Sequence, residues 1–152
     1  LAVCLGNRGD ALERARRLLS NHRRNLSDGL QWVREHSVEQ ATHFQYFDAD
    51  EAIRETIVGI VAGMALGLPD VDRSRPIVAF ARKTESERKV SARGTARLVG
   101  KGLDLSQAIG DASRAVGGDG GGHDIAAGAT IPASRLQEFV DHLDTAVGEQ
   151  LS

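Results

Sequence analysis

The chain has 152 residues, enough for one ordinary domain, and its 41% hydrophobic and 26% charged residues lie near the averages of globular proteins. This composition excludes an intrinsically disordered chain and a membrane protein, and the longest apolar run, residues 57–68, is too short to span a bilayer. The formal net charge of −2 argues against nucleic-acid binding through overall charge. Cys4 is the only cysteine, which excludes an internal disulfide and fits a reducing cytoplasm. Because the chain begins at Leu1 and its only methionine is Met64, we expect a segment of a longer protein.

The first forty residues predict two helices. Between Asp10 and Leu26, apolar positions recur at intervals of three and four residues, as on one face of a helix, and a shorter helix is expected over residues 27–35. Such a helical pair suits a connector between domains. Arginines occupy the other faces of the first helix, where they either line a groove or are merely solvated. The apolar positions are Leu12, Ala15, Leu19, His22 and Leu26.

A strand and a buried helix are expected next. Residues 43–48 alternate with the period of a strand, and Asp50 is expected to cap a helix over residues 51–66 that becomes apolar on nearly every side. Glycines recur four residues apart on one face of this helix, although glycine costs about 1 kcal/mol relative to alanine in a helix. A backbone or a ligand must therefore approach closely, and tight packing on a sheet is the simpler explanation. These glycines are Gly59, Gly63 and Gly67.

The second half of the chain alternates strands and helices. The resulting order favours an α+β (α/β-like) fold, with a mixed β-sheet flanked by helices and preceded by the N-terminal helical connector. The expected strands are residues 77–81, 89–94 and 125–131, and the expected helices are residues 105–116 and 134–151.

Ser91 and Arg93 lie in the most basic stretch of the sequence. From Arg82 to Lys101 there are seven basic residues against two acidic ones, which indicates either an anion-binding surface or a solvated hairpin. Alternation along the strand 89–94 puts Ser91 and Arg93 on one face. A hydroxyl beside a guanidinium can clamp a phosphate, whereas a surface strand pair without function is the alternative.

A run of glycines between residues 117 and 123 is the sharpest local feature. Without Cβ atoms, successive backbone amides can converge on an anion, and the histidine that ends the run adds a further donor. The alternative is a helix C-cap followed by a flexible linker, but an ordered strand of small residues follows at once. The run lacks the ending and spacing of NTPase and Rossmann phosphate loops. The predicted binders of a nucleotide phosphate are Gly120, Gly121, Gly122 and His123.

The other histidines show no metal-ligand spacing, and no Ser/His/Asp triad or pair of catalytic carboxylates can be assembled from the sequence. The Asp-His pair at residues 141–142 resembles a metal motif by letter only. We therefore expect no metal site in this chain. The histidines interpreted as ordinary helix or strand-edge residues are His22, His36, His43 and His142.

Residues 120–128, Gly-Gly-Gly-His-Asp-Ile-Ala-Ala-Gly, resemble the GGGH-x-x-AAG signature of the DHH-associated domain. This domain follows the catalytic DHH domain in RecJ-type exonucleases, oligoribonucleases and related phosphodiesterases. Residues 90–93, Val-Ser-Ala-Arg, are similar to the S-x-R strand of these domains. Residues 22–32 and 53–64 resemble archaeal RecJ-like proteins, and the resemblance covers most of the chain. The DHH motifs themselves are absent from this sequence.

The resemblance implies the C-terminal part of a metal-dependent, single-strand-specific exonuclease. Residues 1–40 would be a helical connector from the catalytic DHH domain, and residues 41–152 the substrate-binding domain. Mn²⁺ or Mg²⁺ would belong to that catalytic domain, so this chain alone should bind weakly and cleave nothing. Expected partners are single-stranded DNA or RNA, the protein's own DHH domain, and replication or repair proteins, with no membrane. By position, Gly120, Gly121, Gly122 and His123 would contact a substrate phosphate or the terminal nucleotide, and Ser91 with Arg93 a neighbouring phosphate.

Three other functions stay open. A small-substrate phosphodiesterase, acting on short oligonucleotides or cyclic dinucleotides, would use the same glycine run. A non-catalytic module for single strands would stack bases on Phe44, Tyr46 or Phe47, although an aromatic content of 4% argues against it. The parent protein could also be a scaffold in a replication assembly, its nuclease activity secondary or lost.

Overall fold

The computed structural model describes residues 2–152, with side chains from Gly9 onward. Its six strands form one sheet in the order β1-β2-β3-β4-β6-β5, in which β2 and β3 are parallel and all other neighbours antiparallel. The predicted α+β fold with a mixed sheet after an N-terminal helix is therefore confirmed. The strands are β1 (Glu39–Gln40), β2 (Gln45–Asp48), β3 (Ile77–Arg82), β4 (Glu87–Arg93), β5 (Asp119–Gly122) and β6 (Ala126–Pro132). The helices are α1 (Ala2–His36), α2 (Val58–Ala65), α3 (Ala96–Gly100), α4 (Leu105–Ala115), the 3-10 turn Ala133–Arg135 and α5 (Leu136–Leu151).

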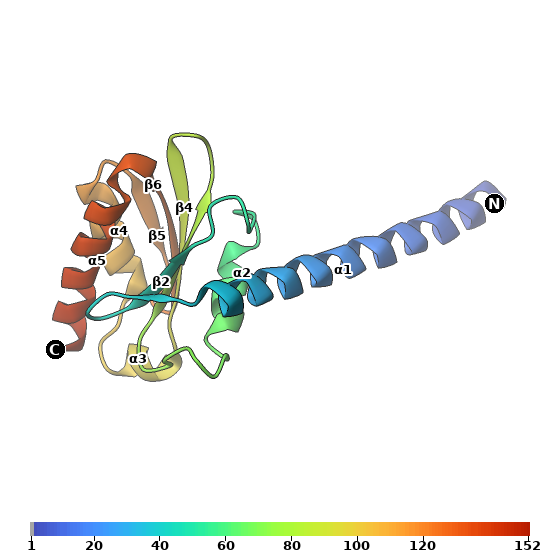
Figure 1. The fold of residues 1–152 in the computed structure, drawn as a ribbon. Helices are drawn as coiled ribbons and strands as arrows, with labels where there is room; N and C mark the ends of the chain where they lie inside the picture. Colours follow the sequence, from blue (N-terminus) through green and yellow to red (C-terminus); the bar gives the residue numbers. More distant parts are fainter. Residues whose placement is uncertain (1) are drawn as a thin grey trace.

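The sheet is covered by helices on both faces, α4 and α5 on one and α2 on the other, while α1 projects away as a rod (Figure 1). Strand alternation sorts the side chains into two apolar clusters. Val78 and Phe80 of β3 pack with Val90 of β4 against α4 and α5. Ile77 and Ala79 of β3 pack instead with α2 and the end of α1. Among residues 2–152, no helix is both long and apolar enough to cross a membrane.

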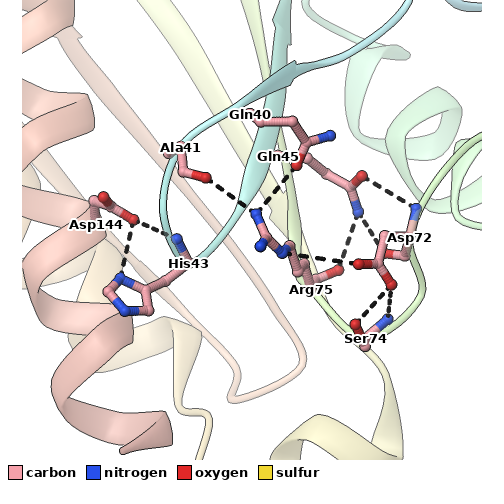
Figure 2. A network of polar contacts seen from close by, with 8 residues as sticks. All are labelled: Gln40, Ala41, His43, Gln45, Asp72, Ser74, Arg75 and Asp144. Atoms are coloured by element: carbon pink, nitrogen blue, oxygen red, sulfur yellow. Dashed lines mark hydrogen bonds and ion pairs between the residues drawn. The ribbon is translucent and has the colours of Figure 1, made fainter.

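Polar side chains fix the segments that lead into β2 and β3 (Figure 2). Gln45 is fully buried, and its side-chain amide donates to the carbonyl oxygen of Arg75 at 3.2 Å and accepts from the backbone amide of Asp72 at 3.2 Å. Asp144 of α5 accepts from the backbone amides of Thr42 and His43 at 3.1 and 2.7 Å. A buried amide group must find partners, so these contacts set where β2 and β3 begin.

Two predictions about the helices are wrong. Residues 2–36 form one continuous helix instead of two, because Gly29 continues the helix and packs against α2, where a Cβ would lie 2.9 Å from Val61. The expected helix over residues 51–66 begins only at Val58, and Asp50 does not cap it. Asp50 has a positive φ of 49° and binds Arg82 through its carboxylate at 2.9 Å. On α1, the predicted apolar residues Leu12 and Leu19 are exposed.

The glycine run is also more regular than expected. Gly120, Gly121 and Gly122 belong to the edge strand β5, which pairs with β6. The absence of side chains lets this strand lie against its neighbours, since a Cβ on Gly120 would come within 2.5 Å of Ala129 and 3.0 Å of the Ser113 hydroxyl. The expected loop of converging amides is therefore replaced by one edge of a sheet.

Candidate functional site

A cavity of about 520 Å³ lies between the start of α2 and the adjoining face of β4, β6 and β5. The helix packs on β3 and β4 on this face. Farther along the sheet, the exposed faces of β6 and β5 carry only alanine and glycine at the cavity, which leaves space above them. Its lining residues are Glu55, Thr56, Gly59, Ile60, Lys83, Lys89, Ser91, Arg93, Gly121, Gly122, His123, Ala126, Ala127 and Gly128.

Strand β4 supplies a row of polar groups to the cavity. Lys89, Ser91 and Arg93 alternate along the strand, so all three project from the same face, and all three line the cavity. At about 3.4 Å per residue, neighbours in this row stand roughly 7 Å apart along the strand and its two ends about 14 Å apart. The prediction that Ser91 and Arg93 lie on the same face of the strand is therefore confirmed.

Arg93 is a half-buried cation without a nearby counter-charge. One of its terminal nitrogens donates to the carbonyl oxygen of Ala92 at 2.8 Å. Among the described residues, no carboxylate oxygen lies within 4.0 Å of its guanidinium. Burial lowers the pKa of Arg93 from its usual value, although arginine stays protonated at neutral pH. A desolvated positive charge of this kind is stabilised by an anion in the cavity.

Gly59 on α2 makes room for that guanidinium. A Cβ at Gly59 would collide with a terminal nitrogen of Arg93 and stand 3.2 Å from the hydroxyl oxygen of Ser91. Gly63, one turn later, would place its Cβ 3.9 Å from the Arg93 side chain, which is an ordinary contact. The sequence predicted that a group approaches these glycines closely. At Gly59 that group is the side chain of Arg93 on β4.

The edge strand β5 forms the opposite wall. Gly121 faces the cavity, and a Cβ added there would meet no atom within 4 Å. The backbone amide of His123 donates to Ala126 at 2.7 Å, so by alternation the amide of Gly122 points away from β6 at the open edge. Gly122 has a φ of 145°, which favours glycine. The His123 ring is exposed at the rim.

Five of the six predicted site residues therefore line one cavity. Gly120 is the exception, because it faces α4 on the other side of the sheet, where its missing Cβ serves packing against Ser113 and Ala129. Sequence alternation already separates Gly120 from Gly121, but that signal is lost once the run is taken as a loop.

Comparison with known proteins identifies the domain. Residues 41–149 match the DHHA1 domain, and this match covers more than half of the chain. The chain belongs to the DHHA1 domain family. It is 29% identical over 151 residues to the uncharacterized protein MJ0831 of Methanocaldococcus jannaschii, covering 99% of this chain and 31% of that protein. The chain therefore spans about a third of the length of this relative.

Two solved structures share the fold of this DHHA1 domain. RecJ from Thermus thermophilus in complex with Mn²⁺ superposes with a TM-score of 0.67 at 18% identity, over 90% of this chain and 18% of that one. The pGpG-specific phosphodiesterase PggH from Vibrio cholerae superposes with a TM-score of 0.53 at 14% identity, over 91% of this chain and 43% of that one. At such identities the similarity is one of fold.

Two lysines of the DHHA1 domain also line the cavity, which the sequence interpretation counted in the basic stretch but did not name as site residues. Lys89 follows the same alternation as Ser91 and Arg93, so the pattern could have shown it. Lys83 comes from the turn after β3, and its ammonium group donates to the Thr130 hydroxyl at 3.1 Å. The position of Lys83 over β6 could not be predicted from hydrophobic periodicity, because it depends on the shape of the turn between β3 and β4.

The basic stretch from Arg82 to Lys101 does not act as one surface. Arg82 binds Asp50 and Glu51 at 2.9 and 2.8 Å, so its charge is compensated. Arg97 and Lys101 line a separate cavity beyond α3. Arg88 pairs with Asp48 and Asp50. Of the seven basic residues, only Lys83, Lys89 and Arg93 line the site.

The described residues offer no metal site. No group of three or more His, Cys, Asp or Glu side chains in the part of the chain described here is arranged to hold a metal ion. The Mn²⁺ or Mg²⁺ that the resemblance implies therefore finds no set of ligands among these residues. The cavity brings together a guanidinium, two ammonium groups, a hydroxyl and backbone amides, which can bind an anion. It also holds one carboxylate, Glu55, whose Oε2 is buried without a hydrogen-bond partner among the described residues.

Proposed function

We propose that this DHHA1 domain holds phosphate groups of a single-stranded nucleic acid for a catalytic DHH domain in the same protein. The parent protein would be a metal-dependent, single-strand-specific exonuclease, with Mn²⁺ or Mg²⁺ bound by the DHH domain and water attacking the phosphodiester there. The isolated chain would then cleave nothing. A cytoplasmic location is part of the proposal, because a single cysteine suits a reducing compartment.

The uncompensated charge of Arg93 carries this proposal. A guanidinium offers a planar fork of donors that matches two phosphate oxygens, and desolvation strengthens such bonds. The Ser91 hydroxyl lies beside it on the same strand face, and Gly59 leaves the space that the arginine occupies. Fixed donors of this kind position a phosphate while another part of the enzyme supplies the metal.

The length of the polar row favours a ligand with more than one phosphate. Lys83 and Lys89 lie together at one end of the cavity, both next to Thr130, and Arg93 stands about 14 Å from Lys89 along β4. Cations at both ends suit a phosphodiester chain better than a mononucleotide.

A small-substrate phosphodiesterase is the second candidate. A cavity of about 520 Å³ falls within the range of roughly 300–1,000 Å³ that is typical of small-molecule sites. A dinucleotide would then fill the site by itself, and added nucleotides would not improve binding. Comparing a dinucleotide with a 15-nucleotide strand therefore separates the two candidates.

Replacing Arg93 with alanine tests the phosphate site. Charge-assisted hydrogen bonds are worth about 1.5–3 kcal/mol, so Arg93→Ala should weaken oligonucleotide binding by roughly ten- to hundred-fold. Fluorescence anisotropy of a labelled 15-nucleotide strand at fixed salt measures this loss. In the parent protein, turnover should fall by a similar factor.

Arg97→Ala is the matched control for Arg93→Ala. It removes the same charge four residues along the chain, in a cavity that Arg93 does not line. Its effect on binding should stay within about two-fold. If Arg93→Ala changes affinity by less than two-fold, or if both variants lose equally, Arg93 is not a phosphate ligand.

A further inference from the structure

A second cavity adjoins the first beneath the projecting helix α1. It measures about 490 Å³ and lies between α1 and the segment that leads into α2. Thr56 lines both cavities, so the second lies next to the first on the side toward α1. The lining residues of this α1 cavity are Leu18, Asn21, His22, Arg24, Asn25, Arg54, Thr56 and Ile57.

The face of α1 changes character where it leaves the domain. Val33 is buried against α2, and Gly29 packs on Val61. Residues three and four positions apart share a helix face, so Asn25 and His22 continue the face of Gly29 and Val33 toward the N-terminus. This face therefore turns from apolar packing to hydrogen-bonding groups directly over the α1 cavity.

Two cations at the α1 cavity lack acidic partners. Among residues 9–152, no carboxylate oxygen lies within 4.0 Å of the guanidinium of Arg24 or Arg54. Asn21 and Asn25 likewise make no side-chain hydrogen bond within the same residues. A solvated arginine needs no partner, but here two arginines, two amides and an imidazole border one hollow that shares Thr56 with the phosphate site.

We propose that the α1 cavity binds the continuation of the nucleic-acid strand whose phosphate Arg93 holds. Arg24 and Arg54 would contact backbone phosphates beyond Thr56, and Asn21, His22 and Asn25 would donate to sugar or base oxygens. This inference rests on the proposed function and deepens it, because a second subsite makes the preferred ligand a strand longer than a dinucleotide.

If this inference is right, the contribution of α1 to binding depends on the length of the ligand. Every ligand with a phosphate at Arg93 depends on that residue, but only a strand long enough to pass Thr56 gains from α1. Each phosphate contact on a single strand adds about 0.7 to the slope of log K against log salt concentration. Losing Arg24 and Arg54 should thus lower this slope by about 1.4 for a long strand and leave a dinucleotide unaffected.

The test is a double variant, Arg24→Ala with Arg54→Ala, in the full 152-residue chain. Anisotropy measures binding of a labelled 15-nucleotide thymidine strand over a range of salt concentrations, and competition measures the 5′-phosphorylated thymidine dinucleotide. We expect about tenfold weaker binding of the long strand and a change below two-fold for the dinucleotide. The matched control, Arg16→Ala with Arg23→Ala, removes two charges from α1 side chains that do not line the α1 cavity and should change neither.

The outcomes separate this inference from the proposed function. Unchanged binding of the long strand, an equal loss in the control variant, or an equal loss for the dinucleotide would each overturn the α1 cavity as a strand subsite. If Arg93→Ala leaves both ligands unaffected while the double variant weakens the long strand, the Arg93 site fails, and the α1 cavity binds strands by itself and not as a continuation of that site. All four arginines are exposed, so we expect both double variants to fold. Circular dichroism on each variant checks that a loss of binding does not come from unfolding.

Discussion

The two faces of the sheet differ in what covers them. On the face toward α4 and α5, Val90 and Ala92 of β4 are fully buried together with Ala129 and Ile131 of β6. On the other face, the same two strands present Lys89, Ser91 and Arg93 beside glycine and alanine, and a cavity replaces the packed layer. One strand thus supplies the core with every second residue and the cavity with the residues between.

The comparison shows how a small domain can keep charged groups half-buried. The apolar layer under α4 and α5 is continuous from β2 to β6, so it can stabilise the sheet without help from the opposite side. The second layer is limited to α2, the end of α1, β2 and β3. Residues at the site can therefore be polar without weakening the main core.

The largest effect is expected from the packed face. Phe139 on α5 is fully buried and meets Phe80 edge to face, with ring centroids 5.9 Å apart. Phe139→Ala should lower the free energy of unfolding by about 3–5 kcal/mol, because it leaves a cavity in the core. For a domain of this size that corresponds to a melting temperature lower by roughly 6–20 °C, measurable by circular dichroism.

Binding should separate from stability in the Phe139→Ala variant. Below its melting temperature, its affinity for an oligonucleotide should stay within two-fold of the unchanged chain, because Phe139 packs in the core under α4 and α5 and does not line the cavity. A large loss of affinity in the folded variant would show that the two faces are coupled through the sheet.

How much of this arrangement the sequence predicts depends on whether the signal is local. Alternation along residues 89–94 correctly put Ser91 and Arg93 on one face, and the apolar periodicity of residues 105–116 correctly predicted α4. By contrast, the position of Lys83 depends on the turn after β3, and Asp50 binds Arg82, 32 residues along the chain, instead of capping a helix. Such long-range contacts leave no period in the sequence.

The glycine run shows the same limit. Glycine has little preference for a strand, so nothing local predicts that Gly120 to Gly122 form β5. The strand exists because β6 offers a pairing edge and α4 lies close enough to require small residues. The expected place of residues 1–40 as a connector from a DHH domain stays a prediction.

The next largest effects come from two neighbouring glycines on opposite faces. Gly120→Val would drive its side chain into Ala129 and the carbonyl oxygen of Gly128, 2.5 and 2.7 Å from the new Cβ. We expect a loss of about 1–3 kcal/mol in the free energy of unfolding, as for an overpacked core. Gly121→Val points into open space and should leave that free energy nearly unchanged, while it fills the cavity and weakens oligonucleotide binding by at least about tenfold.

Each of these two variants is the control for the other. Urea unfolding and oligonucleotide anisotropy on both proteins should give opposite patterns, one variant less stable and the other a poor binder. If Gly121→Val unfolds the chain, its side of β5 is packed and not open. If it binds normally, the edge strand is no wall of the phosphate site.

The smallest effect is expected at Gly59, where a substitution tests whether Arg93 needs the space that the absent Cβ leaves. Gly59→Ala should raise helix stability by up to about 1 kcal/mol, since alanine is the better helix former. Its Cβ would occupy space now held by the guanidinium of Arg93, so that flexible side chain must swing aside. We expect oligonucleotide affinity to fall by about three- to ten-fold while the melting temperature holds or rises.

Gly63→Ala separates this effect from a general change in α2. The substitution is the same, one turn along the same helix face, but its Cβ would stand 3.9 Å from the Arg93 side chain and displace nothing. Gly63→Ala should raise the melting temperature as much as Gly59→Ala does, but leave oligonucleotide affinity within two-fold of the unchanged chain. Thermal melts and anisotropy on the two variants measure both quantities. Equal affinity in Gly59→Ala and Gly63→Ala would mean that Arg93 keeps its contacts after moving, and the space at Gly59 would then serve packing alone.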